Sequence, residues 1–123
     1  MTALPAIGDR FIQQYESVAQ KWGEDLGLDR FYFLGSGPRY GLACEVNLKM
    51  KEMTLTHSEP FHFMEFRHGP MSMVNESAAV IGLLSEVQHK HETAVLQEMT
   101  QLGGPRPGSW RSRCGCCICF RLA

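Results

Sequence analysis

The sequence predicts an α/β fold, a three-layer α-β-α sandwich built on a parallel sheet. Two unbroken apolar runs, Phe31–Leu34 and Ala78–Leu84, are typical of strands that are buried on both faces of such a sheet. Each run is followed by a segment with helical periodicity, as in the strand–helix units from which parallel sheets are made. The length of 123 residues is enough for one domain of this kind and no more.

The composition indicates a globular chain with no strong electrostatic partner. Hydrophobic residues make up 44% of the chain and charged residues 20%, which are ordinary values for a globular protein. The formal net charge of −1 gives no field that would attract nucleic acid or an anionic membrane, so neither partner is expected. Because no apolar run approaches the length of a membrane span and no signal-peptide pattern is present, we expect a cytoplasmic location.

The first half of the chain predicts a helix, a strand and a second helix. Apolar residues recur at three- and four-residue steps over residues 7–26, which predicts a packing helix with one apolar face. After the strand at 31–34, a Gly-Ser-Gly turn leads into a helix from Pro38 to about Met53. We expect the buried stripe of this helix to consist of Leu42, Val46, Met50 and Met53.

The second half predicts a weak strand, a short helix, the buried strand at 78–84 and a last helix. The weak strand covers Leu55–Ser58, and we expect Glu59-Pro60 to interrupt it. A short helix over Phe61–Arg67 must end before the Gly-Pro pair that follows. The last helix is predicted over Gln88–Leu102, with Gly103-Gly104 as its stop signal.

Residues 105–123 differ in character from the rest of the chain. The stretch PRPGSWRSRCGCCICFRLA shows neither helical nor strand periodicity and mixes arginine with cysteine. We therefore place the domain at residues 1–104 and expect an irregular tail, with a sheet that is truncated at its last strands. Four of the five cysteines crowd into this tail, where the intervening chain is too short to wrap a tetrahedral ion. No metal site and no cofactor are expected.

The ordered motifs in the middle of the chain resemble the sugar isomerase (SIS) family. LGSGPRYGLACEVNLKMKE, residues 34–52, is followed by EFRHGP, residues 65–70. This set is similar to the second SIS domain of glutamine–fructose-6-phosphate aminotransferase and of related phosphosugar isomerases and deaminases. The resemblance implies a flavodoxin-like fold and binding of a sugar phosphate of the fructose 6-phosphate or glucosamine 6-phosphate type. It also implies a homodimer or a preceding SIS domain as partner.

The resemblance assigns catalytic roles to Glu52, His68 and Lys49. Glu52 takes the position of the carboxylate that moves a proton between adjacent sugar carbons through an enediol. His68 takes that of the histidine that opens the sugar ring, which in relatives reaches the site of a neighbouring subunit. Lys49 is expected to support Glu52 or the substrate electrostatically. Without the resemblance, Glu52 is interpreted as a solvated helix residue and His68 as a polar residue at a helix end.

A substrate-binding role is predicted for the turn Gly35-Ser36-Gly37, for Arg39 and for Glu45. In a glycine turn before a helix, backbone N–H groups face an anion, to which Ser36 adds a hydroxyl and Arg39 a guanidinium. Glu45 joins the set by the spacing of the resemblance. The same turn is also compatible with a tight strand-to-helix connection that binds nothing. It lacks the third glycine of a dinucleotide fingerprint.

Three functions follow from these observations, and the motifs alone leave them open. The leading hypothesis is part of an aldose–ketose phosphosugar isomerase, or of an aminotransferase or deaminase of the glucosamine-6-phosphate synthase type. The second is a non-catalytic phosphosugar-binding or oligomerisation module. The third is a dinucleotide-binding fragment, which has the weakest support because the fingerprint is incomplete.

Overall fold

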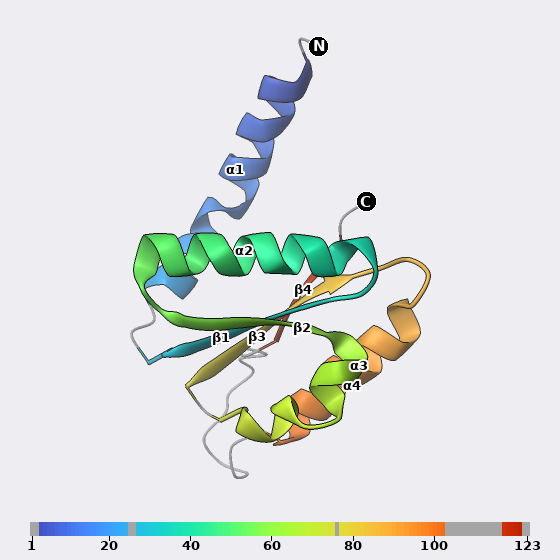
Figure 1. The fold of residues 1–123 in the computed structure, drawn as a ribbon. Helices are drawn as coiled ribbons and strands as arrows, with labels where there is room; N and C mark the ends of the chain where they lie inside the picture. The colour runs from blue at the N-terminus through green and yellow to red at the C-terminus, as the bar shows by residue number, and fades with distance from the viewer. Residues whose placement is uncertain (1–2, 25–26, 76, 103–116, 122–123) are drawn as a thin grey trace.

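The computed structural model describes residues 3–24, 27–75, 77–102 and 117–121 and forms a three-layer sandwich (Figure 1). In chain order the elements are α1 Ala3–Gly23, β1 Arg30–Gly35, α2 Pro38–Thr54, β2 His57–His62, α3 Phe63–Arg67, the 3₁₀ helix η1 Pro70–Met73, β3 Ala78–Leu84, α4 His89–Leu102 and β4 Cys117–Arg121. The strands pair in parallel in the order β2-β1-β3-β4. Helix α2 covers one face of the sheet, and α3 and α4 cover the other (Figure 1). The predicted α-β-α fold is confirmed.

Each face of the sheet has its own core, because successive side chains of a strand point to opposite faces. Toward α2, Phe33 of β1 and Leu83 of β3 pack with Ala43. The larger cluster lies under α3 and α4 and consists of Tyr32, Leu34, Phe63, Phe66, Ala78, Val80, Leu84, Val95, Leu96 and Met99. Burial of each large apolar side chain stabilises the fold by about 1.5–3 kcal/mol, so the α3–α4 side carries most of the hydrophobic stabilisation.

Strand β2 continues through Glu59-Pro60, where the sequence predicted an interruption. A proline is tolerated here because β2 is an edge strand, paired with β1 on one side alone. Its open edge is poorly suited to receiving a further strand. Pro60 has no N–H, and the N–H of His62 donates to Glu65 Oε2 at 3.3 Å.

Part of the predicted irregular tail is a strand. The five residues of β4 pair in parallel with β3, with Val80 opposite Cys117. The prediction of irregular structure is therefore wrong for these residues. Strand β3 would otherwise leave the N–H and C=O groups of its outer edge unpaired, and the segment CICF contains the β-branched and aromatic residues that suit a strand. Residues 103–116 and 122–123, with Cys114 and Cys116, lie outside the described residues.

Helix α1 extends away from the sheet, and the described side chains of its first half do not pack as the sequence predicted (Figure 1). It covers Ala3–Gly23, whereas the periodicity predicted residues 7–26. Its apolar residues Leu4, Ile7, Phe11 and Ile12 are all more than half exposed. The side chains of Val18, Trp22 and Leu26, which belong to the predicted apolar face, lie outside the described ones. Among the helices of these ranges, none combines the length and apolar character needed to cross a bilayer.

Candidate functional site

The turn between β1 and α2 requires its two glycines for reasons of packing and backbone geometry. A Cβ on Gly35 would meet the backbone of Arg39 and Tyr40, with Tyr40 N at 2.7 Å. The first turn of α2 therefore lies directly against the end of β1. Gly37 has φ of 54° and ψ of −130°, a conformation that a residue with a side chain rarely adopts. A tight connection explains both glycines without a ligand.

The first turn of α2 offers few backbone donors to an anion. Pro38 has no N–H, and the N–H groups of Arg39 and Tyr40 donate to the carbonyls of Ser36 and Gly37 at 3.1 and 3.0 Å. Anion contacts at this turn would depend on the helix dipole, the Ser36 hydroxyl and the Arg39 guanidinium. The substrate-binding role of the turn stays a prediction.

A polar and aromatic cluster attaches the start of α2 to the end of β2. The rings of Tyr40 and His62 stack with centroids 3.8 Å apart and an interplanar angle of 21°. The pKa of Tyr40 is raised above its usual value of 10.0, mainly by a hydrogen bond with Cys44. The charge of Cys44, burial and the nearby Glu65 carboxylate add to this shift. The contact between Tyr40 and His62 fixes the start of α2 relative to the edge strand β2.

Three of the predicted site residues lie in a row on the outer face of α2. Lys49 Nζ is 2.9 Å from Glu52 Oε2 and 3.8 Å from Glu45 Oε1. Residues three and four positions apart are neighbours on a helix surface, so the spacing in the sequence places these charges together. All three side chains are more than half exposed. Exposed ion pairs contribute about 0–1 kcal/mol each, so stability gives little reason for this arrangement.

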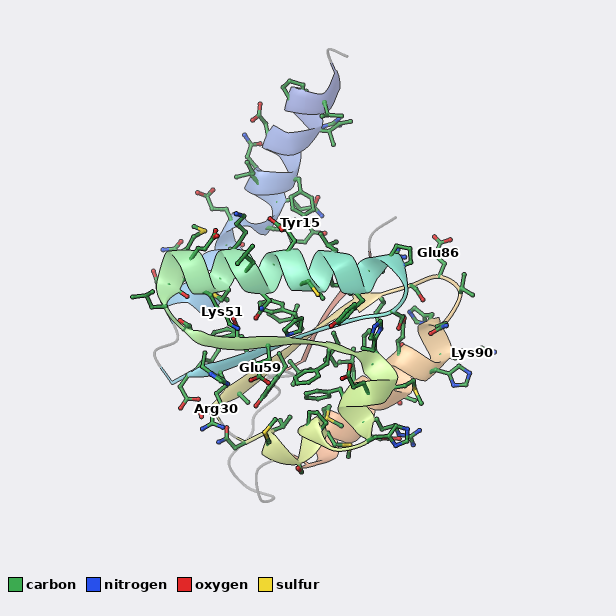
Figure 2. All side chains as sticks on the ribbon, in the orientation of Figure 1. Tyr15, Arg30, Lys51, Glu59, Glu86 and Lys90 are labelled. Atoms are coloured by element: carbon green, nitrogen blue, oxygen red, sulfur yellow. The ribbon has the colours of Figure 1, made fainter. Side chains whose placement is uncertain are left out.

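The length of α2 separates Glu52, at the far end of this row, from the glycine turn. Gly37 and Glu52 are fifteen positions apart along the helix, which corresponds to about 22 Å. Figure 2 shows Lys51, the neighbour of Glu52, at one end of the sheet and Glu86, in the turn after β3, at the other. One hexose phosphate cannot contact both ends of the helix.

His68 lies in a third region of the chain. It is the C-terminal cap of α3, where its N–H donates to the Glu65 carbonyl at 3.0 Å, and it is exposed. Because α3 and α2 pack on opposite faces of the sheet, the sheet stands between His68 and Glu52 (Figure 1). One copy of the described chain does not bring these two predicted catalytic groups together.

The buried side of α2 differs from the predicted stripe. Val46 and Met50 pack against the sheet, but Leu42 is 40% exposed and Met53 is 80% exposed. Their prediction as buried residues was wrong because apolar residues occur around most of this helix, so periodicity could not select a face. Asn47 takes an inner position instead, and its Oδ1 accepts no hydrogen bond from the described residues.

Glu92 is a structural residue that the sequence analysis did not single out. It is 1% exposed, and its carboxylate accepts hydrogen bonds from the N–H and the Oγ of Ser85 at 2.6 and 3.0 Å. An acidic residue in the first turn of a helix is the signal that could have found it. It fixes the β3–α4 loop. Within the described ranges, no three His, Cys, Asp or Glu side chains gather in a way that could hold a metal ion.

Comparison with known proteins gives matches at the levels of family, sequence and fold. A model of the SIS domain matches residues 28–107. A glutamine–fructose-6-phosphate aminotransferase of Clostridium tetani is 35% identical over 109 residues, which are 88% of this chain and 18% of that protein. The C-terminal domain of a glucosamine-fructose-6-phosphate aminotransferase from Francisella tularensis has the same fold, with a TM-score of 0.68 at 24% identity over 79% of this chain and 27% of that one.

A solved glucosamine-6-phosphate deaminase from Thermotoga maritima is also similar. The TM-score is 0.65 at 25% identity, and the match covers 89% of this chain and 31% of that one. This chain spans less than a fifth of the length of the curated relatives that it matches.

Proposed function

The chain belongs to the SIS domain family, as its motifs predicted, and from this premise we propose that it is the phosphosugar-handling part of an isomerase, aminotransferase or deaminase. The observation that carries the proposal is the row of Glu45, Lys49 and Glu52 on the exposed face of α2. The names of the similar proteins, which specify fructose 6-phosphate and glucosamine 6-phosphate, support a hexose phosphate as the substrate class.

In this proposal Glu52 is the base that forms the enediol. Its carboxylate accepts a proton from one carbon of the open-chain sugar and returns it to the neighbouring carbon, so the carboxylate itself is regenerated. Lys49 orients Glu52 through the 2.9 Å contact and offers a positive charge to the enediolate oxygen. Glu45 holds Lys49 from the other side, next to the substrate.

His68 opens the sugar ring by passing a proton to the ring oxygen, and it does so in the site of another copy. The sheet between α2 and α3 supports this arrangement, because it keeps His68 and Glu52 of one copy apart. The glycine turn is about 22 Å from Glu52 along α2, so the phosphate of a sugar at Glu52 is held by a partner. The partner is a second copy or a preceding SIS domain.

A non-catalytic phosphosugar-binding or oligomerisation module is the second candidate. The exposure of Glu52 favours it, because a catalytic carboxylate needs a site from which water is excluded. In that case the row on α2 would recognise the sugar, and proton transfer would belong to another polypeptide.

Exchange of sugar protons with solvent distinguishes the two candidates. We would incubate the full chain with fructose 6-phosphate in D₂O and follow the C1 protons by NMR, because an enediol exchanges them with deuterium. Glu52→Gln keeps the shape of the side chain and removes the base, so the exchange of the C1 protons should stop. The changes in amide chemical shift that fructose 6-phosphate causes in a parallel titration in H₂O should persist. Glu16→Gln, which changes an exposed carboxylate on α1, is the matched control and should exchange normally.

Each outcome of this experiment has a definite meaning. Exchange that stops in the Glu52 variant and continues in the control supports the catalytic proposal. Amide shifts without exchange in the unmodified chain support the binding module. A chain that neither binds nor exchanges contradicts both.

A further inference from the structure

Arg67, the last residue of α3, is joined to Glu98 of α4 by a two-pronged ion pair. Its Nε donates to Glu98 Oε2 at 2.8 Å, and its Nη2 donates to Oε1 at 2.7 Å. A guanidinium that donates two parallel hydrogen bonds fixes the orientation of its partner as well as the distance. The two side chains are 45% and 35% exposed, and exposed ion pairs contribute little to stability. The pair therefore does more to fix the geometry of α3 and α4 than to stabilise the fold.

Glu98 is a rigid point of attachment, because the turn of α4 around it is anchored in the core. Three of its neighbours on α4 are at most 3% exposed and belong to the cluster under α3 and α4, namely Val95, Leu96 and Met99. Helix α3 has only five residues, and isolated helices shorter than about 12 residues are unstable in water, so its position depends on contacts with the rest of the chain. Phe63 and Phe66 attach α3 to the core, and Arg67 attaches its C-terminal end to α4.

His68 directly follows Arg67, and its position depends on the backbone. Its N–H donates to the Glu65 carbonyl at 3.0 Å, and its side chain is exposed. In the part of the chain that the structure describes, no group forms a hydrogen bond or an ion pair with its imidazole. On the other side of His68, the carbonyl of Gly69 accepts hydrogen bonds from the N–H and the Oγ of Ser72, at 3.0 and 2.8 Å. The backbone around His68 is therefore held by Arg67 before it and by Ser72 after it.

We propose that Arg67 and Glu98 are positioning residues for His68, which they hold where it opens the ring of a cyclic sugar phosphate. The inference rests on the proposed function in one respect, which is that His68 passes a proton to the ring oxygen. Such a transfer needs a heavy-atom distance of about 2.6–3.2 Å, and a misplacement of about 1 Å slows a reaction about a hundredfold. Both residues act through the backbone of α3 and exchange no proton with the sugar themselves.

Amide hydrogen exchange of His68, followed by NMR in the full chain, measures the hold of α4 on this residue. Glu98→Ala removes the partner of Arg67 and leaves the sequence around His68 unchanged, so an effect at His68 comes through the folded structure. Its exchange should accelerate about fivefold or more, because the last turn of α3 opens more easily. Amides of β1 and β3 report global unfolding and should change less. Lys90→Ala, at an exposed position in the first turn of α4, is the matched control and should leave the rate at His68 unchanged.

Two sugar phosphates distinguish a positioning role from a merely structural one. Fructose 6-phosphate must open its ring before its C1 protons exchange with D₂O, whereas 5-deoxyfructose 6-phosphate lacks the hydroxyl that closes the ring. The protein concentration is set high enough that spontaneous ring opening in water is too slow to supply the open form. Glu98→Ala should then slow the C1 exchange of fructose 6-phosphate about tenfold or more, because the imidazole is misplaced. The C1 exchange of the deoxy sugar should stay unchanged.

Failure of this inference is distinguishable from failure of the proposed function. An unchanged rate of amide exchange at His68 in the Glu98 variant overturns the positioning role, whatever the chain does to the sugars. An equal loss of C1 exchange with both sugars also overturns it, because a general loss of the folded or bound state would have that effect. A chain that exchanges no sugar protons contradicts the catalytic proposal. Faster amide exchange at His68 in the Glu98 variant of such a chain would still support the hold of α4 on His68.

Discussion

Replacing Gly35 by alanine tests how the connection between β1 and α2 is built. The added Cβ would meet backbone atoms of Arg39 and Tyr40, with Tyr40 N at 2.7 Å. These atoms belong to the first turn of α2, and the helix is held against the sheet by Ala43 and its neighbours, so the clash cannot be relieved by rotating a side chain. Overpacking of a core typically costs about 1–3 kcal/mol, and we expect about 3 kcal/mol or more where backbone must move.

Two nearby glycines provide matched controls. Replacement by alanine should lower the stability of the chain at one of them and raise it at the other. A Cβ added to Gly37 would meet nothing within 4 Å, but the residue has a φ of 54°, so Gly37→Ala should cost about 1–3 kcal/mol through backbone strain alone. Gly41 lies inside α2 with nothing within 4 Å of an added Cβ. Because glycine weakens a helix relative to alanine, Gly41→Ala should stabilise the chain by about 0.5–1 kcal/mol.

Urea unfolding followed by circular dichroism measures all three changes. Domains of this size are stable by about 5–15 kcal/mol, so the expected differences are large on that scale. The expected order of stability is Gly41→Ala above the unmodified chain, then Gly37→Ala, then Gly35→Ala. A Gly35→Ala chain as stable as the unmodified one would refute the packing argument. The glycine would then need an explanation from ligand binding.

Three further predictions concern single contacts. Glu92→Gln should lower the free energy of unfolding by about 1–3 kcal/mol because a buried acceptor of two hydrogen bonds loses its charge, and Glu86→Gln on the exposed turn should not. Arg67→Ala should cost about 0.5–1 kcal/mol, less at high salt, because its pair with Glu98 is partly exposed. The raised pKa of Tyr40 stabilises the fold fully below pH 10.0, and this contribution is lost as the pH rises through the folded-state pKa. The ultraviolet difference between the unmodified chain and Tyr40→Phe should therefore titrate above pH 10.0, and Cys44→Ala should shift its midpoint back toward that value.

Local sequence patterns were sufficient to predict the two strands that are buried on both faces of the sheet. The run at 31–34 became β1, and the run Ala78–Leu84 became β3 with the predicted bounds, because strands in the middle of a parallel sheet are apolar on both faces. Pro60 was misread because the same dipeptide that breaks a central strand is tolerated at an edge, and the position of a strand within the sheet is not a local property. Strand β4 was missed for a related reason, since its pairing partner is distant in the sequence.

The same distinction between local and non-local information applies to the candidate site. The spacing of Glu45, Lys49 and Glu52 makes them neighbours on any helix, and the structure shows Lys49 between the two carboxylates. The distance of Glu52 from the glycine turn follows from helix length once both ends of α2 are known. The separation of Glu52 from His68 depends on which face of the sheet each helix covers, and neither motif contains that information.

The hydrophobic core is larger on one face of the sheet than on the other, and this difference affects where a functional site can form. Under α3 and α4 the aromatic and aliphatic core is closed, with Arg67 and Glu98 joining the two helices at the surface. On the α2 side the core is small, and the large apolar residues Leu48 and Met53 of α2 are exposed close to the row of charges in the sequence. A partner that covered α2, as the proposed function requires, would bury the exposed residues of this helix and desolvate its charges together. The activity proposed for the chain should therefore depend on that contact.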